Sequence, residues 1–288
     1  EEEHESISKI RDDDKFRTLN MERKHAFIVG GFQQYFRLSG QKLPNEPGQQ
    51  LYRDVVFTNV SMMIQRERLK LAQDVLELRN GDMDLIMDAA TVAVDLHEAG
   101  HVFGTSISPH LKPHNNATEE CQAEGCVAQL GEEKTPDKLR GLMLRAAAYG
   151  PIWMMVGLKG AHKKADLYIV GRLMEQGAIT INDNNKLVVD AEKAVPVVKQ
   201  IAKECRLLER PLDDLPGAIK LLGKELSGPM DRAVGEEDVL SAAKKRAESM
   251  FGDDNINSIA AKLKPVADRI MGKPIPFAVF DYQGNPLG

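Results

Sequence analysis

Two histidines four residues apart place the strongest constraint on how this chain can fold. The segment A-V-D-L-H-E-A-G-H-V-F-G-T-S (93–106) carries His97 and His101, with Glu98 next to the first. Residues four apart lie on one face of a helix, about one turn apart, so a helical segment lets both imidazoles converge on a single cation. Glu98 would then stand beside the position of a metal-bound water and could take its proton. The segment predicts a helix with two metal ligands and a general base.

A third ligand is expected elsewhere, because a catalytic zinc normally has three protein ligands and an open position. The segment N-A-T-E-E-C-Q-A-E-G-C-V-A-Q-L (116–130) predicts a helix capped by Thr118, with carboxylates at Glu119, Glu120 and Glu124. Glutamates near the start of a helix are also ordinary surface residues. The apolar C-V-A-Q-L that follows favours burial, and a buried carboxylate needs a partner. We therefore expect one of these carboxylates to complete a His-His-Glu site.

The other histidines are weaker candidates. His110 and His114 lie in the loop between the two helices, which contains Pro109 and Pro113, and loop histidines are more often solvated than metal-bound. His4 and His25 have no partner in the sequence. His162 begins a helical pattern, and its weight depends on the resemblance described below.

Helical periodicity recurs along most of the chain, and it predicts a mainly α fold. One hairpin is expected at 178–190, where two β-branched runs surround an Asp-Asn-Asn turn. Pro196 is expected to mark a break in a helix or the first turn of a new one. An extended segment is expected at 276–284. The expected helices are 21–38, 58–79, 84–104, 117–131, 137–147, 160–176, 191–207, 213–226, 235–251 and 254–271.

Composition limits the classes of function. The net charge of -5 and the pI near 5.9 give no basic field that would draw the chain to nucleic acid or anionic lipid. No apolar run approaches a membrane span. Three cysteines without zinc-ribbon spacing, Cys121, Cys126 and Cys205, are expected to be buried thiols. We expect a soluble, cytoplasmic protein that binds neither nucleic acid nor membrane. Its expected organisation is a charged segment at 1–16 and a single helical domain at 17–288.

With H-E-A-G-H and E-E-C-Q-A-E (119–124) both present, the chain resembles the zinc-binding catalytic domain of dipeptidyl peptidase III. F-T-N-V-S (57–61) and R-E-R-L (66–69) are similar to the family's F-K-N-V-S and Q-R-E-K-L. The segment 161–181, which begins A-H-K-K-A, is similar to the family's A-H-M-Q-A-R-F helix and the strand after it. The similarity covers about 50–225. It implies a helical, zincin-like metallopeptidase domain with a small β-hairpin accessory.

The resemblance also implies roles for individual residues. His97, His101 and Glu120 would hold one Zn²⁺ per chain, and Glu98 would activate the attacking water. His162 would stabilise the transition state at the substrate carbonyl. The implied activity is hydrolysis of peptide bonds, with release of N-terminal dipeptides from short peptides.

Glu119 and Glu124 are then implied to orient the histidines from behind. The chain departs from the family in three places: its histidine motif has five residues where the family usually has six, the loop to the third ligand is shorter, and Asp166 stands in place of an arginine. About 50 residues before F-T-N-V-S are also too few to encode the family's second lobe, which binds the free N-terminus of the peptide.

Two other functions remain open on the sequence. The chain could be a catalytically silent interaction module that zinc stabilises, although Glu98 would have no purpose in a purely structural site. It could also be a zinc hydrolase of a non-peptide substrate, because an activated water does not dictate its electrophile. The sequence leaves the oligomeric state open.

Overall fold

A computed structural model describes residues 22–26, 40–43, 53–57, 66–101, 108–155, 160–210, 236–273, 279–280 and 286–287. The described part is mainly helical, which confirms the predicted fold class. The charged segment 1–16, His4 and the expected helix 213–226 lie outside the described residues.

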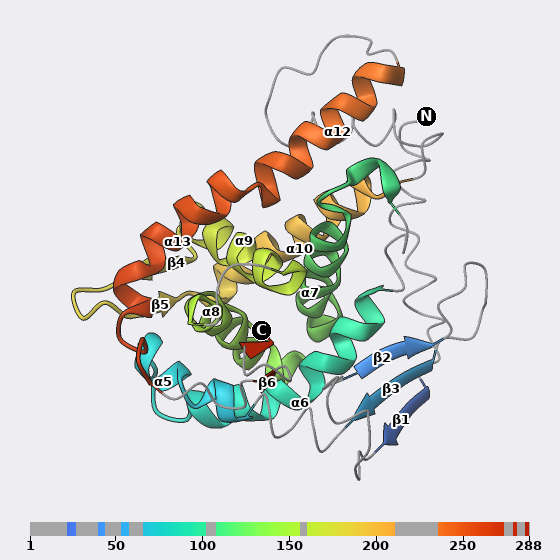
Figure 1. Cartoon of the computed structure of the whole chain (residues 1–288). Coiled ribbons are helices and arrows are strands. Elements are labelled where there is room, and N and C mark those ends of the chain that lie inside the picture. The colour runs from blue at the N-terminus through green and yellow to red at the C-terminus, as the bar shows by residue number, and fades with distance from the viewer. Residues whose placement is uncertain are drawn as a thin grey trace.

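Helix α8 lies in the middle of a group of packed helices (Figure 1). It contacts α6 and α7 on one side and α9, α10 and α13 on others, and α12 contacts α7, α9 and α13. The helices of this group are α6 (Asp82–Gly100), α7 (Asn115–Lys134), α8 (Leu139–Met154), α9 (Ala161–Glu175), α10 (Ala191–Leu208), α12 (Glu236–Phe251) and α13 (Asp253–Ala267).

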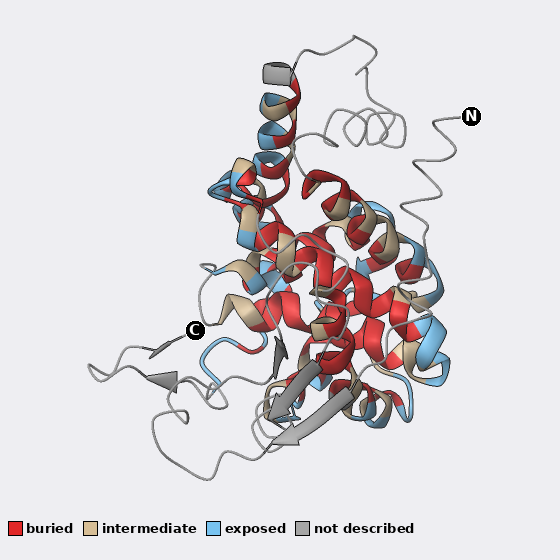
Figure 2. Cartoon of the chain, turned by 90° about the vertical axis from the view of Figure 1, so that its right-hand side faces the viewer, coloured by how far each residue is buried: buried red, intermediate tan, exposed pale blue. Residues whose placement is uncertain are grey.

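The apolar faces of these helices form one core (Figure 2). Its largest fully buried side chains come from the helices and from the segment before α6, so burial of apolar area ties distant parts of the sequence together. They are Phe251, Leu69, Leu76, Ile86, Leu111, Leu130, Leu142, Met143, Leu144, Leu167, Ile169 and Leu173.

Close approach of helix backbones depends on small residues. A Cβ added at Gly100 would lie 2.6 Å from the carbonyl oxygen of Ala123, so α6 and α7 meet here almost backbone to backbone. A Cβ added at Gly125 would lie 3.0 Å from the Cα of Ala202, which sets α7 equally close to α10. The middle of α7 is therefore enclosed by its neighbours, and the polar side chains buried there need partners within the fold.

The hairpin predicted at 178–190 is confirmed. Strands β4 (Ile179–Ile181) and β5 (Leu187–Val189) pair antiparallel. In the turn between them, Asn185 has a φ of 53°, and the side chain of Asn182 accepts hydrogen bonds from the backbone of Asn184 and Lys186. Asparagine tolerates this left-handed conformation better than most residues.

The helix predicted at 21–38 is wrong over 22–26, where the structure has a strand. β1 (Glu22–Ala26) pairs parallel with β3 (Arg53–Phe57), and β2 (Gly40–Leu43) pairs antiparallel with β3 on its other side. The pairing of E-R-K-H-A depends on a partner about 30 residues away along the chain. Sheet pairing of this kind overrides local preference.

The helix predicted at 58–79 is wrong after Val75. Residues 66–69 are helical and α5 covers Ala72–Val75, but Leu76 then forms a parallel bridge with Leu187. The backbone N–H of Glu77 donates to the carbonyl of Leu187 at 2.8 Å. The chain leaves the helix here because it joins the β4–β5 hairpin. Residues 58–65 lie outside the described part.

Two local predictions about helix termini are also wrong. Pro196 neither breaks nor begins a helix, since α10 runs through it from Ala191. The cap of α10 is Asp190, which accepts a hydrogen bond from the backbone of Lys193. Thr118 does not cap α7, which begins at Asn115; its hydroxyl donates to the carbonyl of His114 at 2.9 Å.

The remaining helices lie close to their predicted ranges. α8 extends past 147 to Met154, and α13 ends at Ala267, before the predicted 271. Residues 102–104 of the helix predicted at 84–104 lie outside the described part. Within 276–284 the structure describes β6 (Val279–Phe280), which pairs with β7 (Pro286–Leu287). Cys121, Cys126 and Cys205 are free and buried, as predicted. Among the described helices, none is both long and apolar enough to span a bilayer.

Candidate metal centre

Helices α6 and α7 bring two imidazoles and a carboxylate together. Near the end of α6, His97 and His101 lie one turn apart, and their ring centroids are 4.9 Å from each other. Across from them, Glu120 of α7 places its Oε2 atom 3.2 Å from Nε2 of His97 and 3.7 Å from Nε2 of His101. Both imidazoles therefore present Nε2 to the same carboxylate oxygen.

Two further carboxylates of α7 contact the other nitrogens of these imidazoles. Oε2 of Glu124 lies 3.1 Å from Nδ1 of His97, and Oε1 of Glu119 lies 3.4 Å from Nδ1 of His101. Each imidazole thus has a carboxylate at Nδ1 and the shared Glu120 at Nε2. At His97 this arrangement suits metal ligation, because a carboxylate that accepts the Nδ1 proton leaves Nε2 free to bind the cation.

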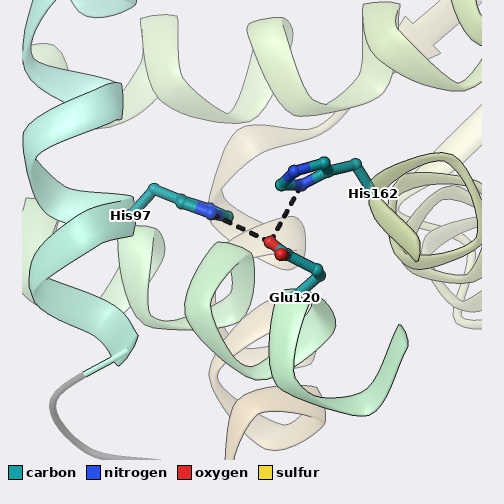
Figure 3. Close-up of side chains that lie close together, drawn as sticks. All are labelled: His97, Glu120 and His162. Carbon is teal, nitrogen blue, oxygen red and sulfur yellow. Dashed lines mark ion pairs between the residues drawn. The ribbon is translucent and has the colours of Figure 1, made fainter. Parts of the chain in front are cut away.

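The start of α9 brings a third imidazole to the same place (Figure 3). Gly160, with φ 111°, turns the chain into this helix in a backbone conformation that other residues rarely adopt. Nδ1 of His162 then lies 2.8 Å from Oε2 of Glu120, and the side chain of His162 is 63% exposed. His162 therefore stands at the open rim of the cluster, whereas His97 and His101 lie deeper.

The imidazoles and carboxylates of this cluster shift the pKa values of one another. Desolvation lowers the pKa of His97, but the carboxylates of Glu120 and Glu124 outweigh it and raise that pKa well above its usual range. Burial raises the pKa of Glu120, but the imidazoles of His162 and His97 outweigh it, so the net effect is a lower pKa. Glu120 is therefore held as a carboxylate, and its negative charge favours a bound cation.

The residues fit a zinc ion on two observations. A tetrahedral zinc with bonds of 2.0–2.2 Å separates its ligand atoms by about 3.3 to 3.6 Å, close to the 3.2 and 3.7 Å between Glu120 and the two imidazoles of α6. Among the described residues, the ligand atoms that all lie within 4.8 Å of one another are those of His97, Glu120 and His162. Oε2 of Glu120 is also buried without a hydrogen bond from any described residue, although imidazole nitrogens surround it. Two imidazoles and one carboxylate form a donor set that zinc prefers.

Glu98, the predicted general base, lies on α6 beside His97 and is partly exposed.

The other histidines, which were predicted to be weak candidates, lie away from the cluster. Nε2 of His110 contacts the carbonyl of Leu208 at 2.8 Å, and Nε2 of His114 contacts Oε2 of Glu248 at 2.5 Å. The expectation that His114 is solvated is wrong, because its side chain is buried and contacts Glu248 of α12. The side chain of His25 lies outside the described part.

The residues behind the cluster were not predicted from the sequence. Arg145 of α8 is buried and donates a hydrogen bond to Glu124 at 2.5 Å. Asp166 of α9, which stands where the family has an arginine, accepts a hydrogen bond from Nε1 of Trp153. Burial and the nearby Glu124 raise the pKa of Asp166 to about 7. Arg145 is the only charged residue in the run G-L-M-L-R-A-A-A-Y-G (141–150). A charge on a buried helix needs a partner, and this is the signal by which Arg145 could have been found.

Comparison with known proteins identifies the fold. No protein-family model matches the sequence, and no curated protein matches it. Among solved structures, dipeptidyl peptidase III from Caldithrix abyssi matches with a TM-score of 0.54 and 16% identity, over 91% of this chain and 56% of that one. Dipeptidyl peptidase III from Corallococcus sp. strain EGB matches with a TM-score of 0.53 and 19% identity, over 80% of this chain and 42% of that one.

The chain therefore spans about half the length of these solved structures. Its mainly helical fold is similar to part of these dipeptidyl peptidase III structures, which confirms, at the level of the fold, the resemblance drawn from H-E-A-G-H and E-E-C-Q-A-E.

Proposed function

We propose that this chain is a zinc-dependent peptidase that hydrolyses peptide bonds. The observation that supports it most is the convergence of Nε2 of His97 and Nε2 of His101 on the same oxygen of Glu120, with Glu98 beside the first imidazole. The likeness to dipeptidyl peptidase III structures supports the same proposal, since the fold that holds the cluster is shared.

In this proposal His97, His101 and Glu120 hold the zinc ion, while Glu119 and Glu124 fix the two imidazoles from behind. Zinc in such a site supplies Lewis acidity and makes water a nucleophile near neutral pH. Glu98 accepts the proton of the attacking water and passes it to the leaving amine. His162, at the exposed rim, donates a hydrogen bond to the substrate carbonyl oxygen as negative charge develops there.

Release of dipeptides is a narrower proposal within this one. It follows from the names of the structures that the chain matches, and the chain spans about half of each. Product analysis by mass spectrometry decides it: successive loss of two residues from the N-terminus of a short peptide supports dipeptide release, whereas internal or single-residue cleavage contradicts it and leaves peptide hydrolysis standing.

The first experiment measures zinc content and peptide turnover in the same preparations. We expect about one zinc per chain in the intact protein and in Glu98→Gln, and much less in Glu120→Ala, because only the last variant removes a ligand. We expect Glu98→Gln to lose at least about 100-fold in turnover, the scale of general base catalysis. Glu133→Gln, which changes an exposed glutamate near the end of α7, serves as the control.

Unchanged turnover in Glu98→Gln would contradict the proposed mechanism.

A second candidate function, a zinc-stabilised module without catalysis, is favoured by one observation: His162 lies 2.8 Å from Glu120, so it could close the site as a fourth protein ligand. Bound zinc without hydrolysis of any peptide in a broad panel, together with weaker zinc binding in His162→Ala, would select this alternative.

A further inference from the structure

A buried chain of contacts leads away from the candidate metal centre and ends on α8. The two carboxylate oxygens of Glu124 are divided between two partners. Oε2 lies 3.1 Å from Nδ1 of His97, and Oε1 accepts a hydrogen bond from Nη1 of Arg145 at 2.5 Å. The side chains of Glu124 and Arg145 are only 7% and 8% exposed. Water therefore competes little for either contact.

Arg145 is itself held in place by its neighbours on α8. Its guanidinium lies over the ring of Tyr149, 4.8 Å from the centroid, and that ring stacks on Trp153 at 5.6 Å. These three residues follow one another at intervals of one helical turn, so they line one face of α8. The indole of Trp153 donates a hydrogen bond to Asp166 of α9, which is one turn after His162. The same face of α8 thus contacts α7 through Glu124 and α9 through Asp166, and these two helices carry Glu120 and His162.

We propose that Arg145 is a positioning residue of the metal centre: it fixes the carboxylate of Glu124, which in turn sets the ring orientation of His97. This inference rests on the proposed function, since it concerns the same zinc site. The physical reason is that a glutamate side chain has several rotatable bonds, and one hydrogen bond to an imidazole leaves them only partly restrained. A second hydrogen bond from a rigid, stacked guanidinium removes this freedom.

The alternative is that Arg145 only stabilises the helix packing, and α8 offers a control for that case. Arg140 forms an ion pair with Asp82 through two hydrogen bonds, at 2.8 Å from Nε and 2.7 Å from Nη2. Asp82 is also buried, but it stands at the start of α6, four turns before His97. Arg140→Met therefore breaks a comparable ion pair between α8 and a neighbour without touching the residues around Glu124.

The test measures zinc affinity by competition with a chelator of known affinity, alongside the melting temperature. We expect both Arg140→Met and Arg145→Met to melt at lower temperature. Only Arg145→Met is expected to bind zinc more weakly, by about tenfold, the lower end of the effect of residues that support metal ligands. Arg145→Lys, which keeps the charge but loses the planar fork, is expected to fall between Arg145→Met and the intact protein. Equal zinc affinities of Arg140→Met and Arg145→Met would overturn the proposal.

A double-variant cycle separates positioning from a general loss of packing. If Arg145 acts through Glu124, zinc binding by Glu124→Gln should weaken little further when Arg145→Met is added, so the two effects should not sum. Additive effects would show that Arg145 acts by another route and would contradict the proposal. If Arg145→Met does not fold, the same cycle is run with Arg145→Lys.

Failure of this inference can be told apart from failure of the proposed function, because the readout is zinc binding and not turnover. If the intact chain binds zinc but cleaves no peptide, the proposed function is contradicted and the role of Arg145 in zinc binding is not. If the intact chain binds no zinc after reconstitution, both are contradicted.

Discussion

Single carboxylates in this chain connect elements that the sequence separates, and Asp82 is the clearest example outside the metal centre. It is the first residue of α6, where a negative charge is favourable, and it accepts hydrogen bonds from the backbone of Arg79 and from Arg140 of α8. The hydrogen bonds from Arg140 are the largest influence on its pKa and, with that from Arg79, lower it despite the burial of the carboxylate. Asp82 therefore stabilises the start of one helix and its packing on another.

The lowered pKa of Asp82 predicts a dependence of stability on pH. The unfolded chain holds this proton more tightly than the folded one, so the stabilisation is complete above the unfolded pKa of about 3.9 and is lost as the pH falls through the lower folded value. We expect Asp82→Asn to lower the free energy of unfolding by about 1–3 kcal/mol at pH 7, and by less near pH 3. Urea unfolding at both pH values measures the difference.

The control is Asp88→Asn on the same helix. Asp88 pairs with Lys138 at 3.0 Å but is 73% exposed, so its loss should change stability little at either pH. A penalty for Asp82→Asn that is as large at pH 3 as at pH 7 would show that the ionised carboxylate is not what stabilises the fold.

Much of the candidate site could be predicted at this scale because its residues carry local signals. His97, Glu98 and His101 form a motif whose spacing indicates one face of a helix, and Glu120 belongs to a second motif further along the sequence. Arg145 could not be predicted, because its role depends on which helix α8 packs against. A lone arginine in an apolar run shows that a partner is needed, but it does not identify the partner.

At the scale of elements, the crossing of α6 and α7 decides whether the candidate metal centre can form. Gly100 lies between the two imidazoles of α6 and allows this helix to approach the backbone of Ala123. Glu124 directly follows Ala123 on α7, and Glu120 precedes it by about one turn, so this close approach of the two helices lies at the cluster. A wider separation would draw the imidazoles away from both carboxylates.

This crossing predicts a specific effect of Gly100→Ala. Alanine ordinarily favours a helix over glycine by about 1 kcal/mol, but here the new methyl group would lie 2.6 Å from a backbone oxygen. We expect a net destabilisation of about 1–3 kcal/mol and weaker zinc binding, measured by urea unfolding and chelator competition. At Gly131 of α7 the added Cβ would meet the end of the flexible Leu142 side chain at 2.6 Å, so Gly131→Ala is the control. Equal zinc affinities in both variants would contradict the prediction.

Elements were predictable where local pattern and tertiary contacts agree. The hairpin has its turn residues in place, and α6, α7 and α9 have uninterrupted periodicity. The prediction failed where a partner distant in sequence decides the outcome, as for β1 with Arg53–Phe57 and for Leu76 with Leu187. It also failed at Pro196, because the packing of α10 tolerates the loss of one backbone hydrogen bond.

At the scale of the whole molecule, zinc binding would connect the folding of α6 and α7. The proposed ligands come from both helices, and a ligand that binds only the folded chain stabilises it by mass action. At a free zinc concentration about 100 times the Kd, the gain is about 2.7 kcal/mol. For a chain of this size that corresponds to a rise in melting temperature of roughly 5–10 °C.

We therefore expect removal of zinc with a chelator to lower the melting temperature by a similar amount, and zinc, but not magnesium, to restore it. Differential scanning fluorimetry of the intact chain and of Glu120→Ala gives the comparison. The melting temperature of Glu120→Ala should respond little to either treatment. An equal response of both proteins would place the stabilising zinc elsewhere.

The three buried thiols make the enclosure of α7 observable in solution. Cys121 and Cys126 lie on α7 and Cys205 lies on α10, and burial raises the pKa of all three. A thiol reagent can react with them only when the protein opens around them, and Cys121 directly follows Glu120. The rate of alkylation at Cys121 therefore reports how often the part of α7 that carries Glu120 becomes accessible, without any substitution in the chain.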